Sequence, residues 1–452
     1  MERTLIAELS KKVGEEVLIN AVVSVARKQG KMAFFDFRDR SSIIQGVVFG
    51  KPEVLEVAKE VNEEYSLSVT GIVNERPEKM INPDVENGNI ELEITGIEIL
   101  NASEAMPFDL EAELNIDTLL DYRPLTLRHS RQLAIFNIQA TIVEAYGDFM
   151  RQQGFKEFQS PKIVGGDAEG GAEVFKVKYF KDVEASLSTS PQLYKQIMVG
   201  VYERVFTFAT AFRAEKSATS RHLSEYTSLD AEMGFIKDHT DVMRMETKLM
   251  KFISKYIAEK NEAELKTLEV DLPLIPDTDN LPFMKLREAQ ELIKKETGVD
   301  KTKLPDLEPE DERWLCEYAK KELGSDFIFI THQPVNKRPF YTMEDPEDIG
   351  YTKSFDLLFR GVEITTGGQR VHDLETLKKK IEKNGLDAEK FEFYLQAFKF
   401  GVPPHGGWGM GLERLTAKFC GVANVKEATL FPRDINRIDT FTSKDHSDTA
   451  EL

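Results

Sequence analysis

The first hundred residues are dominated by short apolar runs. Apolar residues, many of them β-branched or aromatic, gather in segments separated by turn-forming or charged stretches: 17–25, 32–37, 43–49, 67–73 and 90–99. Runs of this length and composition are typical of β-strands. No long helical pattern interrupts them. Five short strands in this arrangement predict a small β-barrel of the OB type, which we expect to occupy residues 1–105.

The pattern changes after the predicted barrel. Residues 106–130 have little periodicity and are expected to form a hinge. A helix capped by Ser130 and ended by Gly154 is predicted next, because apolar residues recur at helical spacing at Ile135, Ile138, Ile142, Tyr146 and Phe149. Strands and helices then mix, and we expect a second domain over residues 131–441, with an acidic insertion at about 262–322. Residues 442–452 form a polar tail.

Composition narrows the class of protein. The chain has 452 residues, of which 30% are charged and 41% hydrophobic, as in ordinary globular proteins. It has neither an apolar run long enough for a membrane helix nor a secretory signal. Two cysteines, Cys316 and Cys420, exclude a disulfide framework, so a cytoplasmic location is expected. The net charge of −19 argues against nonspecific coating of nucleic acid, although it allows a local basic surface.

The segment 205–235 carries the strongest chemical pattern. Two β-like runs flank a polar loop, and the second run places Ser228, Asp230 and Glu232 on one face by its period of two. The loop holds two arginines, a glutamate and a histidine: Arg213, Glu215, Arg221 and His222. The acidic side chains on the open face of the hairpin could bind an amine, and the basic side chains at its tip could bind phosphates. The hairpin therefore suits a substrate that has both groups. The alternative is a solvated hairpin with surface ion pairs.

Two further segments carry candidate chemistry. The glycine-rich stretch 401–421 allows close approach of a ligand to the backbone and is followed by a helix with Arg414; the alternative is a turn before a surface helix. In segment 355–373, Asp356 and Glu363 form a carboxylate pair that could hold Mg²⁺ beside phosphates, or two unrelated strand-edge acids. The chain has no phosphate-loop or kinase motif and no class I synthetase signature.

The three segments together resemble one family. FRAE with its hairpin is similar to motif 2 of class II aminoacyl-tRNA synthetases, GMGLER to motif 3, and the helix before GFKEFQSP, ending at Pro161, to motif 1. The predicted barrel fits the subgroup that serves aspartate, asparagine and lysine. SPQLYKQ, at 190–196, resembles the aspartate enzymes, and EGGAEVF, RHLSEYTSLDAEM and FPRD are similar to their archaeal and eukaryotic forms.

The resemblance implies a fold, an activity and a set of site residues. The fold is α+β, with an antiparallel sheet flanked by helices, and motif 1 implies a homodimer. ATP would be bound by Arg213, Glu215, Arg221, His222, Glu363, Gly411 and Arg414, of which Arg213, Arg414 and Glu363 are also the expected catalytic residues. Mg²⁺ would be held by Asp356 and Glu363, and aspartate by Glu169, Gln192, Lys195, Asp230 and Arg370. Anticodon bases would meet Phe34, Gln45 and Glu91.

The expected reaction is activation of L-aspartate with ATP to aspartyl-adenylate, followed by transfer to the 3′ end of tRNA(Asp). Whether the enzyme also aminoacylates tRNA(Asn) stays open. Near Ser24 this chain has a small residue where relatives often have an aromatic residue. Three alternatives also stay open: an asparaginyl-tRNA synthetase, a paralogue that adenylates aspartate to make free asparagine, and a non-catalytic nucleic-acid-binding paralogue. Lys195 could also be an ordinary surface lysine, and either Phe34 or Phe35 could be core.

Overall fold

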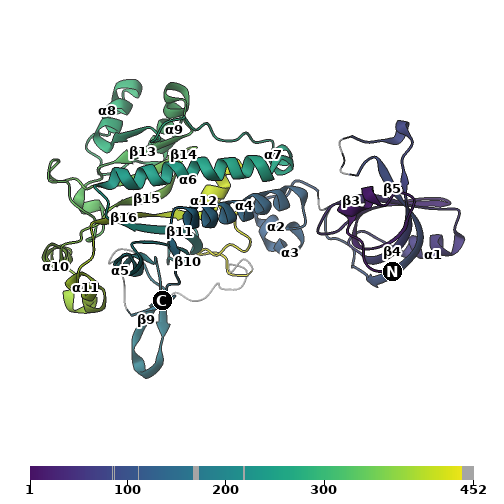
Figure 1. Cartoon of the computed structure of the whole chain (residues 1–452), viewed down its shortest axis with the longest axis horizontal. Coiled ribbons are helices and arrows are strands. Elements are labelled where there is room, and N and C mark those ends of the chain that lie inside the picture. Colours follow the sequence, from purple (N-terminus) through teal and green to yellow (C-terminus); the bar gives the residue numbers. More distant parts are fainter. Residues whose placement is uncertain (84, 86, 110, 166–172, 217–218, 440–452) are drawn as a thin grey trace. The chain divides into compact units, whose positions relative to one another are not determined.

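The computed structural model describes residues 1–83, 85, 87–109, 111–165, 173–216 and 219–439. The chain divides into two compact units, Met1–Ala112 and Glu113–Leu452. The boundary falls within the segment 106–130, which was predicted to be a hinge. Part of that segment is helical, since it contains α2 (Ile116–Asp121) and α3 (Arg123–Thr126). Figure 1 gives the element labels.

The first unit is a closed five-stranded barrel with the strand order β1-β2-β3-β5-β4, which confirms the predicted OB fold. Its strands are β1 (Glu16–Gln29), β2 (Met32–Arg38), β3 (Ile43–Phe49), β4 (Ser66–Glu75) and β5 (Ile90–Asn101). The unit also has a 3-10 helix, η1 (Ile6–Lys11), and a helix, α1 (Pro52–Glu60). The sequence pattern did not indicate α1, whose nine residues give little room for a periodic signal.

Alternation within β2 explains how the barrel is filled. Ala33, Phe35 and Phe37 are buried, whereas Phe34 is only half-buried on the other face of the strand. Neighbouring side chains of a strand point to opposite faces. Phe35 is therefore the core residue of the adjacent pair, and Phe34 lies on the outer side of the barrel.

The second unit is built on an eight-stranded sheet of order β12-β13-β14-β15-β16-β11-β10-β6, antiparallel except at its two edges. The predicted antiparallel sheet flanked by helices is thus confirmed. The strands are β6 (Lys156–Glu157), β10 (Arg204–Phe212), β11 (Glu225–Gly234), β12 (Phe283–Lys285), β13 (Phe327–Thr331), β14 (Ser354–Phe359), β15 (Val362–Gln369) and β16 (His405–Gly411). A separate small sheet joins β7 (Ile163–Val164), β8 (Lys176–Lys178) and β9 (Glu184–Leu187).

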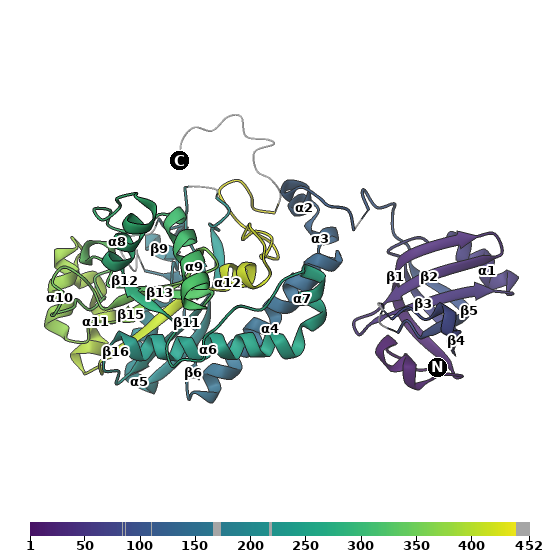
Figure 2. The same cartoon turned by 90° about the horizontal axis from the view of Figure 1, so that it is seen from above.

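Two long helices cover one face of the main sheet and lie side by side, α4 (Ser130–Gln152) and α6 (His239–Lys260), as Figures 1 and 2 show. They enclose the largest apolar core together with β10, β11, β15, β16 and α12 (Leu412–Phe419). Helix α4 has nearly the predicted bounds, and Gly154 follows it at φ +79°. The predicted Ser130 cap is wrong: the imidazole Nδ1 of His129 accepts from the Arg131 backbone N–H (3.0 Å).

Further helices pack on the other side and at the edge of the sheet, whereas α7 (Glu262–Leu268) packs against α4. α5 (Gln192–Tyr202), α10 (Leu374–Lys383) and α11 (Glu392–Lys399) share a second core. The stretch predicted to be an acidic insertion supplies α7, the edge strand β12, α8 (Leu286–Thr297) and α9 (Pro309–Leu323). It is thus joined to the main sheet through β12 and to a third core through α8 and α9.

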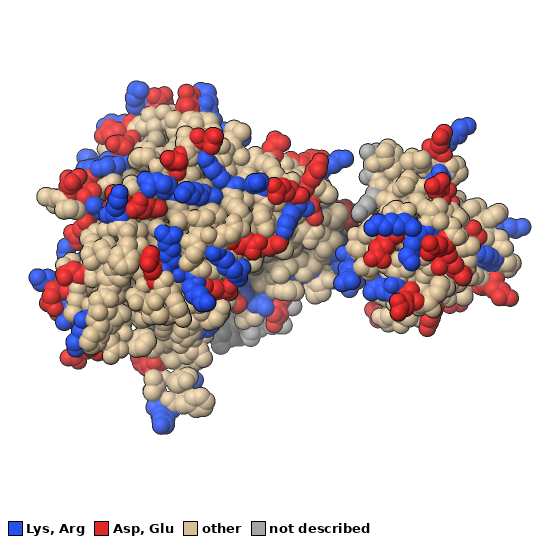
Figure 3. Space-filling view, viewed as in Figure 1, with Lys and Arg blue, Asp and Glu red and all other residues tan. Residues whose placement is uncertain are grey.

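Charge is spread over the surface. On the face shown in Figure 3, basic and acidic side chains are interspersed over the second unit, and both signs occur on the barrel. The net charge of −19 is therefore not gathered into one acidic field on this face. Among the helices that the structure describes, none combines the length and the apolar composition that crossing a bilayer requires.

Candidate functional site

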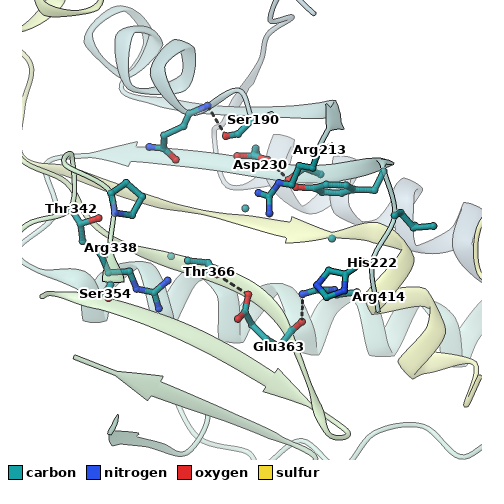
Figure 4. A pocket seen from close by; sticks show the side chains of 18 of the residues that line it. Ser190, Arg213, His222, Asp230, Arg338, Thr342, Ser354, Glu363, Thr366 and Arg414 are labelled. Atoms are coloured by element: carbon teal, nitrogen blue, oxygen red, sulfur yellow. Dashed lines mark hydrogen bonds between the residues drawn. The ribbon is translucent and has the colours of Figure 1, made fainter. Parts of the chain in front are cut away.

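A cavity of about 410 Å³ opens on the face of the main sheet that α4 and α6 leave uncovered (Figure 4). The structure brings most of the predicted site residues of the second unit into this one cavity. Those that line it are Gln192, Lys195, Arg213, Glu215, Arg221, His222, Asp230, Glu363, Arg370, Gly411 and Arg414. Asp356 lies just outside the lining set, and Glu169, with the neighbouring glycines 170 and 171, lies outside the described residues.

The hairpin of β10 and β11 forms the floor of the cavity. Leu229 and Ala231 pack into the core beneath the sheet, so the alternating polar residues face the other way. Ser228, Asp230 and Glu232 are nevertheless only 7%, 2% and 0% exposed. The alternative of a solvated hairpin is therefore wrong for this part of β11, because Asp230 and Glu232 lie in the protein interior.

Lys195 reaches the floor of the cavity from α5. Its Nζ donates to Asp230 Oδ2 (2.7 Å) and to the Trp408 carbonyl (2.8 Å), and lies 3.4 Å from Glu232 Oε2. The residue is 1% exposed, which rules out a surface lysine. A buried ammonium is tolerated only with partners that offset its desolvation. Here two carboxylates and a carbonyl do so.

Arg370 completes a compact charge cluster. Its Nε donates to Glu232 Oε1 (2.9 Å) and its Nη2 to the Gly407 carbonyl (3.0 Å). Burial raises the pKa of Glu232, but Arg370 and Lys195 outweigh it and hold the pKa below its ordinary value. A Cβ at Gly407 would lie 2.3 Å from Glu232 Oε2, so glycine is required for this approach. Two cations and two carboxylates share the site.

Two arginines stand at the opposite end of the cavity. The guanidinium of Arg213 lies over the Tyr226 ring, 5.4 Å from its centroid. Arg414 donates from Nε and Nη2 to the Arg221 carbonyl (3.3 Å each) and from Nη1 to the Glu363 carbonyl (3.1 Å). A guanidinium that is fixed in place presents its N–H donors in one plane, which suits it to binding phosphate oxygens. Figure 4 shows Arg213 and Arg414 on either side of one open space.

The loop between β10 and β11 places Arg221 and His222 beside Arg414. Arg221 forms an ion pair with Glu312 of α9, whose carboxylate also accepts from the Glu363 backbone N–H (3.2 Å). Burial, and then the Arg414 charge, lower the pKa of His222, so the imidazole is neutral at pH 7. The stretch predicted to be an acidic insertion therefore contributes a carboxylate to the cavity's edge.

Asp356 and Glu363 are the candidate magnesium ligands. Asp356 Oδ2 accepts from Gln333 Nε2 (2.9 Å) and pairs with Arg338, while its buried Oδ1 has no partner among the described residues. Burial, and then repulsion from Glu363, raise the pKa of Asp356 to about 7 against the lowering effect of Arg338. The positive charge beside these two carboxylates does not fully offset their negative charge. The pair is therefore suited to binding a cation that enters the site together with the nucleotide.

Several residues of the site were not predicted from the sequence. Arg338, Tyr341 and Thr342 come from the segment between β13 and β14, and Ser190, Thr366 and Glu413 also line the cavity. Burial raises the pKa of Glu413 to about 7. Among the described residues, no group of three or more His, Cys, Asp or Glu side chains is arranged to hold a metal ion. A magnesium site would therefore need ligand oxygens from a substrate.

The barrel presents a second candidate site on its outer face. Gln45 Oε1 accepts from Arg76 Nη2 (2.8 Å), and Arg76 Nε lies 3.7 Å from Glu91 Oε2. β2 and β5 both pair with β3, and burial alternation places Phe34, Gln45 and Glu91 on the same face of these strands. An aromatic ring beside amide and carboxylate groups is suited to stacking on and hydrogen bonding to bases.

Comparisons with known proteins agree with this arrangement. Residues 115–435 match the family described as tRNA synthetases class II (D, K and N), and residues 17–100 match the OB-fold nucleic acid binding domain. The aspartate–tRNA(Asp/Asn) ligase of Thermus thermophilus is 42% identical over 96% of this chain and 99% of its own. The aspartate–tRNA(Asp) ligase of Pyrococcus horikoshii is 37% identical over 94% and 96%.

A solved structure shares the whole fold. The asparaginyl-tRNA synthetase of Pyrococcus horikoshii, complexed with asparaginyl-adenylate, superposes with a TM-score of 0.88 at 30% identity, covering 97% of this chain and 99% of that one. The resemblance inferred from the three motifs is thus confirmed over nearly the full length. The chain belongs to the class II tRNA synthetases of the D, K and N group.

Proposed function

We propose that this chain is an aspartate–tRNA ligase, which activates L-aspartate with ATP and transfers it to tRNA. The observation that carries the proposal is the buried cluster of Lys195 and Arg370 with their acids, which shares a cavity with Arg213 and Arg414. The cavity thus combines a site for a small zwitterionic acid with a site for phosphates. The named relatives support the same activity.

The charges at the floor of the cavity favour aspartate over asparagine. Lys and Arg side chains have donors but no acceptors. A side-chain carboxylate of the substrate can accept from both cations, whereas the NH₂ group of asparagine would face donors. A site built around polar partners discriminates strongly against a substrate that leaves them unpaired. Gln192 and Asp230, whose carboxylate also accepts from Lys195, supply acceptors for the α-ammonium group.

The reaction needs positioning and charge more than covalent help from the protein. The α-carboxylate of aspartate attacks the α-phosphorus of ATP, a P–O bond forms, and pyrophosphate leaves. Arg213 offsets negative charge on the phosphoryl oxygens, and Arg414 and Arg221 hold the phosphate tail. Mg²⁺ held by Asp356 and Glu363 would offset phosphate charge. A hydroxyl at the tRNA 3′ end then attacks the carbonyl carbon, and AMP leaves.

Isotope exchange between pyrophosphate and ATP tests the activity. We expect exchange that depends on aspartate, with kcat/KM for asparagine lower by on the order of 10³-fold or more. Preferential exchange with asparagine would identify an asparaginyl enzyme instead. Exchange with aspartate but no charging of any tRNA would identify an adenylating paralogue, and no exchange with either amino acid would overturn the proposal.

We further propose that the enzyme charges tRNA(Asn) as well as tRNA(Asp). The relative named for both tRNAs is 42% identical to this chain, and the Pyrococcus horikoshii relative named for tRNA(Asp) alone is 37% identical. Separate charging of the two transcripts with aspartate tests this. Charging of tRNA(Asp) alone would restrict the enzyme to one tRNA.

The outer face of the barrel is proposed to bind the anticodon. We expect Phe34→Ala to raise the KM for tRNA, because loss of one base–aromatic stack costs about 1–3 kcal/mol. Pyrophosphate exchange, which needs no tRNA, should stay unchanged. The control is Leu100→Ala, an exposed apolar residue at the other end of β5 from Glu91. Equal effects of the two substitutions on the KM for tRNA would contradict an anticodon role for Phe34.

We also propose a cytoplasmic homodimer joined through α4 and the strand region at Pro161, next to β7. In the described chain, Leu133 of α4 and Ile163 of β7 are 45% and 48% exposed, as expected of apolar residues that a second copy would cover. Sedimentation equilibrium should give twice the mass of the 51.4 kDa chain.

A further inference from the structure

A chain of buried polar side chains lies behind the amino-acid end of the cavity. It runs from Gln192 and Gln196 on α5 to Tyr394 on α11 and His405 at the start of β16. These residues are 4%, 0%, 2% and 0% exposed. Only Gln192 lines the cavity. Buried polar groups are costly unless they are hydrogen-bonded, so the orientation of each group can be worked out from its neighbours.

The first fixed point is the imidazole of His405. Its Nδ1 lies 2.8 Å from the Pro403 carbonyl oxygen, which can only accept, so Nδ1 carries the proton. Burial lowers the pKa of His405 to about 4, so the ring is neutral at pH 7. In a neutral imidazole the other nitrogen is an acceptor. Nε2 therefore accepts, and Gln196 Nε2, at 2.9 Å, donates to it.

The orientation of Gln196 then determines that of Gln192. With its Nε2 directed at His405, Gln196 offers Oε1 as an acceptor on the other side. Two donors use that oxygen, Gln192 Nε2 at 3.0 Å and the Tyr394 hydroxyl at 3.2 Å. The amide nitrogen of Gln192 is thus directed into the interior. Its carbonyl oxygen, which has no hydrogen bond among the described residues, is the amide atom left for the cavity.

We propose that His405 is a positioning residue which, through Gln196, holds the Gln192 amide so that its carbonyl oxygen faces the α-ammonium group of the bound amino acid. The inference rests on the proposed function, since it assigns a partner within the same site. Gln192 and Asp230, whose Oδ2 also accepts from Lys195 Nζ (2.7 Å), then form a pair of acceptors for the ammonium group. A reversed Gln192 amide would direct N–H groups at the ammonium and lose its hydrogen bond to Gln196.

Two substitutions of His405 separate the two ring nitrogens. In His405→Asn, the amide can replace Nδ1–H toward Pro403 but provides no acceptor at the Nε2 position. In His405→Gln, the longer side chain can place its Oε1 where Nε2 was and accept from Gln196. The backbone carbonyl of residue 405, which accepts from the Arg370 N–H (2.8 Å), is retained in both.

The experiment measures steady-state pyrophosphate exchange by the full-length enzyme. We expect His405→Asn to raise the KM for aspartate about tenfold, because one buried polar group loses its partner. The KM for ATP should stay within about twofold, and His405→Gln should return the KM for aspartate to within about threefold of wild type. Equal loss for aspartate and ATP in both variants would show a merely structural role and overturn the inference.

A substrate analogue gives a second readout. Succinate is aspartate without its amine, so its inhibition constant should be unchanged in His405→Asn while the KM for aspartate rises. An equal rise for both, or no change in the KM for aspartate, would overturn the inference. Pyrophosphate exchange by the wild-type enzyme tests the proposed function independently of this inference about His405. If asparagine proves to be the substrate, the same comparison is made with asparagine and succinamate; if neither amino acid supports exchange, both proposals fail.

Discussion

Replacement of Lys195 by methionine is expected to abolish most aspartate activation while leaving nucleotide binding in place. The ammonium of Lys195 is buried and within 3.4 Å of both Asp230 and Glu232. Removing one member of a buried, hydrogen-bonded charge cluster costs about 3–5 kcal/mol, since the partners are left uncompensated. Each 1.36 kcal/mol is tenfold in rate. We therefore expect kcat/KM for aspartate to fall by between about 150- and 5,000-fold.

Two measurements separate loss of recognition from loss of folding. The dissociation constant of a non-hydrolysable ATP analogue should stay within about threefold of wild type, because Arg213 and Arg414 remain at the other end of the cavity. The preference for aspartate over asparagine should shrink, since one of the two cations is gone. The control is Lys301→Met, which removes a lysine paired with Glu308 and Asp311 outside the cavity. An unchanged preference in Lys195→Met would show that this lysine does not recognise the substrate.

Local patterns were sufficient for the features that depend on near neighbours in sequence. Short apolar runs identified the five barrel strands, alternation identified the polar face of β11, and helical spacing identified α4. The glycines before Arg414 were predicted to let a ligand approach the backbone closely. At Gly407 protein atoms occupy that space, since an added Cβ would lie 2.0 Å from the Ala231 carbonyl oxygen and 2.3 Å from Glu232 Oε2. The period of a strand or helix is a property of the local backbone, and such features are therefore visible in a single sequence.

Contacts between distant segments were not visible in the pattern. Arg221 pairs with Glu312, 91 positions away, and Lys195 bonds to Trp408, 213 positions away. Neither the burial of Lys195 nor the place of Glu312 at the site follows from spacing, because both arise when α5 and α9 pack on the sheet. The choice between Phe34 and Phe35 likewise needed the register of the closed barrel. Only the resemblance to a known family predicted that Lys195 and Arg370 belong to the same site.

Stability should depend on pH through Glu246, which lies on the core side of α6. The residue is 0% exposed, and no ion pair to it occurs in the described part of the chain. Burial, and then Asp356, raise the pKa of Glu246 to about 8 from an ordinary 4.5, against a lowering contact with Thr365. Between these values the folded state holds a proton that the unfolded state has released. The stability of the folded state therefore falls as the pH rises from about 4.5 to about 8.

Glu246→Gln replaces the acid by a neutral group of the same shape and should remove this dependence. We expect the variant's free energy of unfolding to gain about 3 kcal/mol relative to wild type between pH 5 and pH 8, since one group contributes at most about 1.4 kcal/mol per pH unit. Glu413, whose pKa is also raised, is present in both proteins and cancels in the difference. Urea unfolding followed by tryptophan fluorescence reports on the second unit alone, because Trp314 and Trp408 both lie in it.

The matched control for Glu246 is Glu259→Gln, on the solvent-exposed side of the same helix. It removes one carboxylate from α6 without touching the core, so its effect on the unfolding free energy should stay within about 0.5 kcal/mol at every pH. The contrary outcome is that the difference in unfolding free energy between wild type and Glu246→Gln changes with pH as little as the difference for the control. In that case Glu246 is ionised in the folded protein. The core beneath the catalytic sheet would then have to admit water or a cation to that carboxylate. The carboxyl behind Thr365 and Asp356 would then contribute to the electrostatics of the proposed magnesium site as well as to the fold.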